Sequence, residues 1–395
     1  MPFRVCFLVE DYYPAIHGST TQIMLLSKSI CSRGGESTII TRRLSKEHPS
    51  REELNGSVII RVPPAIGLNR YGKFLMIIPA IIALIGNRNR YDLILVSDFK
   101  VLGVFAVLIA KLFGKKCFLR GATCGEMDGS YAFAFDDNPS PLKRWLIERL
   151  FALRNMLLKK ADAFLSISRV ISDELRSAGV DPRKIVDFGA AVDTERFCTV
   201  TDSERMELRE RLKLPRNKYL YMYSGRLAQG KGLNHLTEAF RMLHEKHNDI
   251  ALALVGSAQG HKLDYESVMR DYFTTHQLDQ DTYFIGEVSN IEEYLQAADC
   301  FVFPTENEAL GNSIMEASSV GLSIVASNVG GVPDVVEDGV SGKLVEPGDA
   351  AALSNAMETM YIDKDHAKAL GISASKRIRN IFTVESKIRI LSDLI

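Results

Sequence analysis

Residues 300–317 read CFVFPTENEALGNSIMEA. The apolar run 300–303 predicts a buried parallel strand, and the residues that follow Gly311 predict a helix. Glu308 is then expected in the loop at the carboxyl end of the strand, and Glu316 about one turn into the helix. Backbone N–H groups at the helix start would face the same space as both carboxylates. Amides suit phosphate and carboxylates suit sugar hydroxyls, so the segment predicts a site for an anionic ligand rich in hydroxyls, such as a nucleotide sugar.

The alternation of strand-like and helical runs continues along all 395 residues. It predicts an α/β protein with two Rossmann-like, doubly wound parallel-sheet domains that face each other across a cleft. A small, glycine-containing segment at 188–193 marks the expected boundary. The predicted division is an N-terminal domain at 1–190, a second domain at 191–380, and a C-terminal helix at 381–395 that packs back on the first domain. Strands are expected near 4–9, 37–41, 58–62, 92–96, 116–119, 164–168, 185–188, 219–224, 250–255, 282–285, 299–303, 323–326 and 343–345.

The composition is that of an ordinary globular protein, with 46% hydrophobic and 25% charged residues. The formal net charge of -1 gives no indication of nucleic acid as a partner. The six cysteines are scattered without a CxxC pair, which favours reduced, buried thiols. No signal peptide precedes the first predicted strand, so we expect a cytoplasmic protein.

Two apolar stretches bear on membrane contact. Residues 74–85 are apolar but contain a proline and are too short to span a bilayer, which takes about 20 residues. Residues 142–160 are basic and amphipathic and can lie on anionic lipid at the cytoplasmic face of a membrane. The alternative for 142–160 is a core-facing helix with a solvated basic face.

A second motif follows the predicted strand 219–224 and reads GRLAQGKGL from Gly225. Arg226 and Lys231 flank this short loop, so both cations can reach one phosphate group or two adjacent ones. Fixed cations stabilise the charge that develops on a departing diphosphate, which allows a reaction without a metal. The spacing also matches a P-loop, but Gly232 stands where Mg²⁺ coordination needs Ser or Thr. No GxGxxG follows a strand, which argues against dinucleotide binding.

The loop at 10–20 forms a third element, between the first strand and its helix. Gly18 allows close approach of the backbone to a ligand, although a plain strand–helix turn explains the loop equally well. The triplets at 279–281 and 363–365 have the DxD spacing of some metal sites. Their positions favour turn and N-cap roles, and no metal site is predicted.

Taken together, these residues resemble the retaining, GT-B-fold glycosyltransferases of glycosyltransferase family 4. The resemblance covers nearly the whole chain and is strongest over 220–350. Glu308 and Glu316 look like the E-x7-E motif of that family, and the segment from Gly225 to Gly232 looks like its diphosphate-binding loop. Further matches are Gly286-Glu287-Val288, Ala297-Ala298-Asp299, and the segment from Val329-Gly330-Gly331 to Val345.

The resemblance implies a role for each matching position. Arg226 and Lys231 would hold the diphosphate, Glu308 would contact the transferred sugar, and Glu316 would bind the ribose hydroxyls. The remaining donor contacts would be Gly18 and Gly225 at the diphosphate, Val288 at the base, and the amides of Leu310, Gly311 and Asn312 at the sugar and phosphate.

The chain also departs from the family pattern. A histidine that often follows the strand near 116–119 is missing, and Arg120 or Glu126 is expected to replace it as a sugar or acceptor contact. Ala309 and Leu310 stand where the family usually has Gly and Phe. Ala190-Ala191 replaces the usual Asn-Gly.

The sequence and this resemblance together predict a retaining, metal-independent, hexosyl-type glycosyltransferase that needs no cofactor. A UDP-sugar is the favoured donor, and a glycan, lipid-linked or small-molecule acceptor fits cell-surface polysaccharide or glycoconjugate synthesis. A catalytically inactive GT-B scaffold that binds a nucleotide sugar is the alternative. A sugar phosphorylase is a third possibility, but it would need a cofactor lysine and a longer chain.

Overall fold

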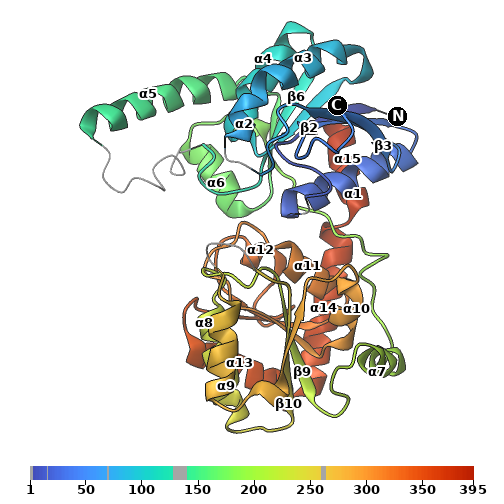
Figure 1. Cartoon of the computed structure of the whole chain (residues 1–395), viewed down its shortest axis with the longest axis vertical. Coiled ribbons are helices and arrows are strands. Elements are labelled where there is room, and N and C mark those ends of the chain that lie inside the picture. Colours follow the sequence, from blue (N-terminus) through green and yellow to red (C-terminus); the bar gives the residue numbers. More distant parts are fainter. Residues whose placement is uncertain (1–2, 16, 69–70, 128–139, 259–263) are drawn as a thin grey trace. The chain divides into compact units, whose positions relative to one another are not determined.

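The computed structural model describes residues 3–15, 17–68, 71–127, 140–258 and 264–395 (Figure 1). The chain divides into two compact units. Unit 1 comprises Met1–Ala191 and Val384–Ile395, and unit 2 comprises Val192–Thr383. Both units are α/β, and in each a sheet is covered by helices.

The described part of unit 1 contains an eight-stranded sheet in the order β3-β4-β2-β1-β5-β6-β7-β8. Neighbouring strands are parallel except β3 and β4, which form an antiparallel hairpin at the edge. The strands are β1 (Arg4–Leu8), β2 (Glu36–Arg42), β3 (Arg51–Leu54), β4 (Ser57–Val62), β5 (Leu93–Ser97), β6 (Lys116–Gly121), β7 (Ala163–Ser166) and β8 (Ile185–Asp187). The helices are α1 (Gly18–Ser32), α2 (Gly72–Leu75), α3 (Ile77–Gly86), α4 (Phe99–Leu112), α5 (Pro141–Leu158), α6 (Arg169–Ser177) and α15 (Val384–Leu394).

The last helix of the chain, α15, completes the core of unit 1. It lies beside α1, and its Ile388 and Leu391 are buried in one cluster with Ile23 and Leu26 of that helix (Figure 1). The chain therefore returns to unit 1 after it has formed unit 2.

Unit 2 has a six-stranded parallel sheet in its described residues, in the order β11-β10-β9-β12-β13-β14. The strands are β9 (Tyr219–Ser224), β10 (Ile250–Val255), β11 (Thr282–Gly286), β12 (Cys300–Phe303), β13 (Ser323–Ser327) and β14 (Lys343–Val345). The helices are α7 (Asp202–Arg211), α8 (Leu233–His244), α9 (Glu266–Thr275), α10 (Ile291–Ala297), α11 (Asn312–Ser319), α12 (Val332–Val335), α13 (Ala350–Ile362) and α14 (Lys364–Ile381).

Every strand predicted from the sequence is present, with ends that differ by no more than two residues. Strands β9, β10 and β12 are buried along their whole length, which is why they read as continuous apolar runs. Strand β3 was missed because its REEL sequence is polar. The Asn55-Gly56 turn that joins it to β4, with both residues at positive φ, is the signal that would have indicated this hairpin.

The apolar run at 74–85 forms the end of α2 and most of α3. Met76, Ala80 and Leu84 are buried and α3 packs on β2 and β4, as expected for a helix on a sheet. Across the described ranges, no helix combines the length and apolar character that a membrane crossing requires.

Candidate functional site

The loops that follow β9 and β12 meet at the carboxyl edge of the sheet in unit 2. These strands are hydrogen-bonded neighbours, so their carboxyl ends lie side by side. Lys231 Nζ donates a hydrogen bond of 2.9 Å to Glu308 Oε2. Both side chains are largely buried, with exposed fractions of 25% and 19%. The structure thus joins one residue of each predicted motif in an ion pair.

The loop from Gly225 to Gly232 is held by groups that the sequence did not single out. The Tyr223 hydroxyl donates to the carbonyl oxygen of Arg226 at 3.1 Å. Burial raises the pKa of Tyr223, Glu308 raises it further, and Arg226 opposes both effects, so the hydroxyl lies near both charges. The Arg226 side chain is exposed and available at the surface of unit 2.

Gly232 allows this loop to pack tightly against the end of β12. It adopts φ +67°, and a Cβ at this position would lie 1.7 Å from the carbonyl oxygen of Pro304. No other residue type fits such an approach without a shift of the backbone. The glycine that argued against a P-loop therefore has a packing role, because it brings Lys231 to the Glu308 loop.

A third loop, after β13, supports the backbone of Glu308. The Gly331 N–H donates to the carbonyl oxygen of Glu308 at 3.0 Å. A Cβ on Gly330 would lie 1.9 Å from the same oxygen, and a Cβ on Gly331 would lie 2.1 Å from that of Ala309. These two glycines belong to the matched segment 329–345, and their small size permits the contact.

The start of α11 lies against the Glu308 side chain. Gly311 has φ +93°, and a Cβ built on it would lie 3.3 Å from Glu308 Cγ. Leu310 is buried, and Asn312 is the first residue of the helix. The predicted amide contacts at 310–312 and the predicted sugar contact at Glu308 are therefore adjacent.

Glu316 lies one turn into α11, in a different electrostatic environment. Burial raises its pKa to about 7, nearby Arg196 opposes this, and Glu292 adds to it. Arg196 Nη2 lies 2.6 Å from Glu292 Oε2 and donates to the carbonyl oxygen of Ser289 at 2.6 Å. This arginine was missed by the sequence reasoning. It ties the loop that carries Val288 to the surroundings of Glu316.

In unit 1, Gly18 is the first residue of α1, so the helix begins within the loop that was predicted at 10–20. The next residue, Ser19, donates through Oγ to Asp98 Oδ2 at 3.0 Å. Asp98 follows β5 and adopts φ +58°, a left-handed conformation that is uncommon for a residue other than glycine. No sequence motif indicated this pair, which lies at the carboxyl edge of the unit 1 sheet.

Arg120, the residue before the last of β6, is a buried cation with few partners. Its exposed fraction is 2%, its Nη1 donates to Ser97 Oγ at 3.3 Å, and its Nε has no hydrogen-bond partner. Burial lowers its pKa, whereas Asp98 and Glu126 raise it. Lys387 of α15 is buried nearby, and burial together with Arg120 lowers the pKa of its amine to about 8.

Glu126 is also buried, and protein donors occupy its carboxylate. Oε1 accepts from Ala122 N, Thr123 N and Thr123 Oγ1 at 3.0–3.1 Å, and Oε2 accepts from Phe99 N at 3.2 Å. Burial raises its pKa, and Asp98 adds to the effect. This set of bonds ties the turn after β6 to the start of α4.

No group of three or more His, Cys, Asp or Glu side chains with metal-binding geometry occurs among the described residues. The two DxD triplets have other partners. Asp281 pairs with Lys218 and with His244, and Asp363 caps α14 by accepting from His366 N. The N-cap role predicted for 363–365 is confirmed.

Comparison with known proteins agrees with this fold. Solved structures with the same fold include Anabaena HepE in complex with UDP (18% identity, TM-score 0.77) and sucrose-phosphate synthase from Thermosynechococcus elongatus (21% identity, TM-score 0.81). Each alignment covers 99% of this chain and 98% of the other. The fold is therefore that of the GT-B glycosyltransferases.

Two family models identify the chain more closely. The model described as Glycosyltransferase Family 4 matches residues 16–196, and the model described as Glycosyl transferases group 1 matches residues 204–377. The chain belongs to glycosyltransferase family 4, as its motifs indicated.

Curated relatives match the chain at somewhat higher identity than these two solved structures do. The capsular polysaccharide biosynthesis glycosyltransferase CapM of Staphylococcus aureus is 25% identical over 59% of this chain and 61% of its own length. The D-inositol 3-phosphate glycosyltransferase of Xylanimonas cellulosilytica is 26% identical over 90% of this chain and 86% of its own. The match to CapM thus spans about three fifths of that relative.

Proposed function

We propose that this protein is a retaining, metal-independent, hexosyl-type glycosyltransferase that takes its sugar from a nucleoside diphosphate donor. The observation that carries the proposal is the Lys231–Glu308 pair, which puts a cation and a carboxylate at one loop junction on a GT-B fold. A UDP-sugar is the favoured donor, because HepE is a structural relative that was solved with UDP and with UDP-glucose.

In this proposal, unit 2 binds the donor. Arg226 and Lys231 hold the diphosphate and stabilise the negative charge that develops on it as the sugar leaves, so no metal is needed. Glu308 accepts hydrogen bonds from the sugar hydroxyls and Glu316 from the ribose. The supporting donor contacts are the backbone groups at Gly225, Val288, Leu310, Gly311 and Asn312.

Unit 1 is proposed to bind the acceptor, with Gly18 against the diphosphate. Arg120 is the proposed sugar or acceptor contact, since its Nε lacks a protein partner. Glu126 is proposed to influence the sugar or acceptor indirectly, through its charge near Arg120. Its carboxylate already accepts hydrogen bonds from the backbone of the turn that follows β6. The names of CapM and related proteins support a glycan or lipid-linked acceptor in cell-surface polysaccharide synthesis.

The experiment that tests the activity measures donor binding and release of nucleoside diphosphate for UDP-, GDP- and ADP-sugars in the presence of EDTA. We expect wild type to release one diphosphate slowly and Lys231→Ala to lose this release. Lys246→Ala, which removes an exposed lysine of unit 2 paired with Glu358, is the matched control. Binding without release, even with an acceptor extract, would favour the inactive scaffold, and absence of binding would refute the donor site. Retention is tested by the anomeric configuration of the glycoside product.

We also propose that α5 contacts the cytoplasmic face of a membrane. Six large apolar side chains recur along α5 at spacings of one to four residues, and each is more than half exposed: Leu142, Trp145, Leu146, Leu150, Leu153 and Met156. Figure 1 shows the helix extending away from the sheet of unit 1. At its C-terminal end, Leu158 is buried and packs beside Gly103 of α4. The helix also carries Arg144 and Arg149, whose charge complements anionic lipid.

The single tryptophan of the chain, Trp145, provides a direct test of this contact. With phosphatidylglycerol vesicles we expect a blue shift of its fluorescence and co-sedimentation of the protein, and much less of both with phosphatidylcholine. Leu146→Glu with Leu150→Glu should abolish binding. Ile372→Glu, at an equally exposed position of α14, should leave it unchanged. Equal binding by all variants, or none by wild type, would refute the contact.

A further inference from the structure

A polar cavity of about 490 Å³ lies at the amino edge of the unit 2 sheet. Tyr219 and Ser323, the first residues of β9 and β13, line it together with Arg205 and Arg209 of α7 and Lys368 of α14. Lys231 and Glu308 follow the last residues of their strands, so the cavity and the candidate donor site are at opposite edges of the same sheet. The function proposed above makes no use of this cavity.

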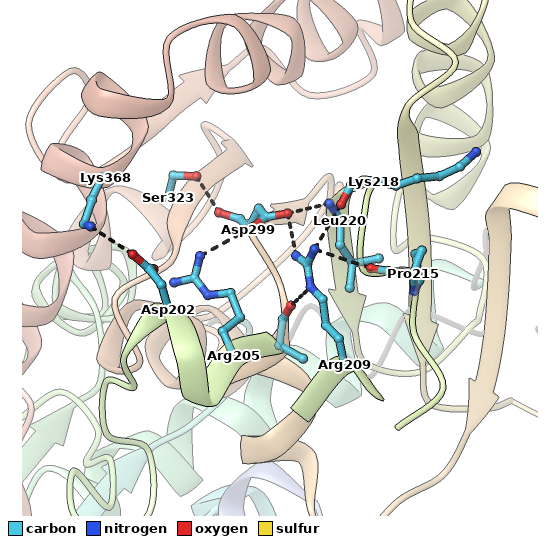
Figure 2. Close-up of polar contacts among 10 residues, drawn as sticks. Asp202, Arg205, Arg209, Pro215, Lys218, Leu220, Asp299, Ser323 and Lys368 are labelled. Carbon is cyan, nitrogen blue, oxygen red and sulfur yellow. Dashed lines mark hydrogen bonds and ion pairs between the residues drawn. The ribbon is translucent and has the colours of Figure 1, made fainter. Parts of the chain in front are cut away.

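The inner wall of the cavity contains two guanidinium groups and one carboxylate (Figure 2). Asp299 Oδ2 accepts from Arg209 Nη2 at 2.6 Å and from Leu220 N at 2.7 Å. Arg209 is buried and also donates to the carbonyl oxygens of Ala297 and Lys218 at 2.8 and 3.0 Å. These bonds satisfy the arginine and neutralise most of the Asp299 charge.

Arg205 interacts only weakly with the Asp299 carboxylate. Its Nη1 lies 3.4 Å from Asp299 Oδ1, and its buried Nε has no hydrogen-bond partner (Figure 2). Its side chain is 27% exposed, so it reaches the cavity without being solvated as a surface arginine would be. One positive charge on this wall is therefore poorly compensated.

Tyr219 lines the same wall, but its hydroxyl is buried and does not open onto the cavity. Its exposed fraction is 8%, and burial is the largest of the effects that raise its pKa. Ser323 is the polar side chain nearest in effect to this hydroxyl, and the Ser323 hydroxyl also donates to the carbonyl oxygen of Asp299 at 3.3 Å. Arg205 is therefore the group on this wall whose charge favours an anionic occupant.

The other charges that line the cavity do not cancel this excess. Lys218 and Arg216 are paired with Asp281 and Glu210, which lie outside it. Lys368 and Asp202 form a pair of 3.7 Å at the rim, where both side chains are more than two thirds exposed. Asp249 accepts from Tyr361, and Lys364 and Asp365 are exposed. Exposed rim charges are screened by solvent, so the inner wall decides the preference.

We propose that this cavity binds a phosphate group, either as inorganic phosphate or as part of a small phosphomonoester. The exposed part of Arg205 presents a planar fork of donors, a geometry that matches tetrahedral oxyanions. Water can hydrogen-bond this part of Arg205 but cannot neutralise its charge. The volume accommodates a phosphomonoester as well as the free ion.

The test is isothermal titration of the full chain with inorganic phosphate and with glycerol 3-phosphate, at constant ionic strength in chloride. A Lys231→Ala background removes phosphate binding at the candidate donor site. We expect one phosphate per chain, and at least tenfold weaker binding in Arg205→Gln. Tighter binding of inorganic phosphate would identify the free ion as the ligand, and tighter binding of glycerol 3-phosphate would identify a phosphomonoester.

Arg211→Gln is the matched control, because Arg211 lies on the same helix, pairs with Glu293 and does not line the cavity. It should bind phosphate as the parent does. Tyr219→Phe removes only a buried hydroxyl and should likewise leave phosphate binding unchanged. No binding at millimolar phosphate, or equal binding in Arg205→Gln and its parent, would overturn the proposal and leave water as the occupant.

Discussion

Lys231 Nζ lies 2.9 Å from Glu308 Oε2, although 77 positions separate the two residues in the chain. The contact exists because β9 and β12 are neighbours in a parallel sheet and place the loops at their carboxyl ends side by side. Gly232 lets those two loops approach closely, and Gly330 lets the loop after β13 approach the Glu308 backbone. In the proposed mechanism, an incoming diphosphate and sugar share the cation and the carboxylate that now bind each other.

Replacing Lys231 tests the catalytic role of this pair. We expect Lys231→Ala to lower turnover by about 10²–10³, since a fixed donor aimed at developing charge is typically worth ~3–4 kcal/mol. The free energy of unfolding should change by about 1 kcal/mol or less, because the pair is partly exposed. Turnover assays and urea denaturation check the two effects. Unchanged turnover with a saturating donor would remove Lys231 from the mechanism.

Glu316 should make the stability of unit 2 depend on pH. Its pKa in the folded protein is about 7, above the ordinary value of 4.5, so the folded state binds this proton more tightly. The free energy of unfolding should therefore fall as the pH rises from about 4.5 to 7, by up to about 3 kcal/mol at 1.4 kcal/mol per pKa unit.

Glu316→Gln should flatten this dependence and stabilise the protein at pH 8, while it weakens donor binding. Urea denaturation at several pH values, for wild type and variant, measures the difference. Glu245→Gln, at an exposed position, is the control. A difference between wild type and Glu316→Gln that does not grow with pH would contradict the assignment.

Comparing Gly330→Ala with Gly339→Ala separates the effect of a close contact from the effect of backbone strain on stability and turnover. Both glycines have positive φ, +56° and +72°, but only Gly330 would place a Cβ against the Glu308 carbonyl. We expect Gly339→Ala to cost about 1–2 kcal/mol from its backbone conformation alone. Gly330→Ala should cost more and should also lower turnover, because it displaces the Glu308 loop. Equal losses of stability with full activity in both variants would show that the contact is unimportant.

Asp299 belongs to the matched Ala297-Ala298-Asp299 motif, and its role is structural. Asp299→Ala should destabilise unit 2 by about 3–5 kcal/mol, because it leaves the buried Arg209 guanidinium without its carboxylate. Asp202→Ala, which removes a 78% exposed carboxylate of the same region, should change stability little. Thermal and chemical denaturation provide the comparison. A large loss of donor affinity in Asp299→Ala protein that remains folded would instead indicate a direct role at the donor site.

The local sequence was sufficient to predict every strand except β3, and the loops that carry the candidate donor residues. Strands buried on both faces must be apolar throughout, so 219–224, 250–255 and 300–303 were clear without any tertiary information. The glycines and charged residues that follow them occupy loops for equally local reasons. The polar edge strand β3 lacks such a pattern and was missed.

Only the tertiary structure decided which loops meet and which side chains are buried together. Strand order depends on long-range packing, which no local period records, so the Lys231–Glu308 contact and the support from Tyr223 appear only in the folded unit. The same holds for Arg196 near Glu316 and for the carboxylate of Glu126, which turns inward to four protein donors. The spacing of apolar residues along a helix or strand determines which face of that element a side chain occupies. The residues that it contacts there come from segments that are far away in the chain.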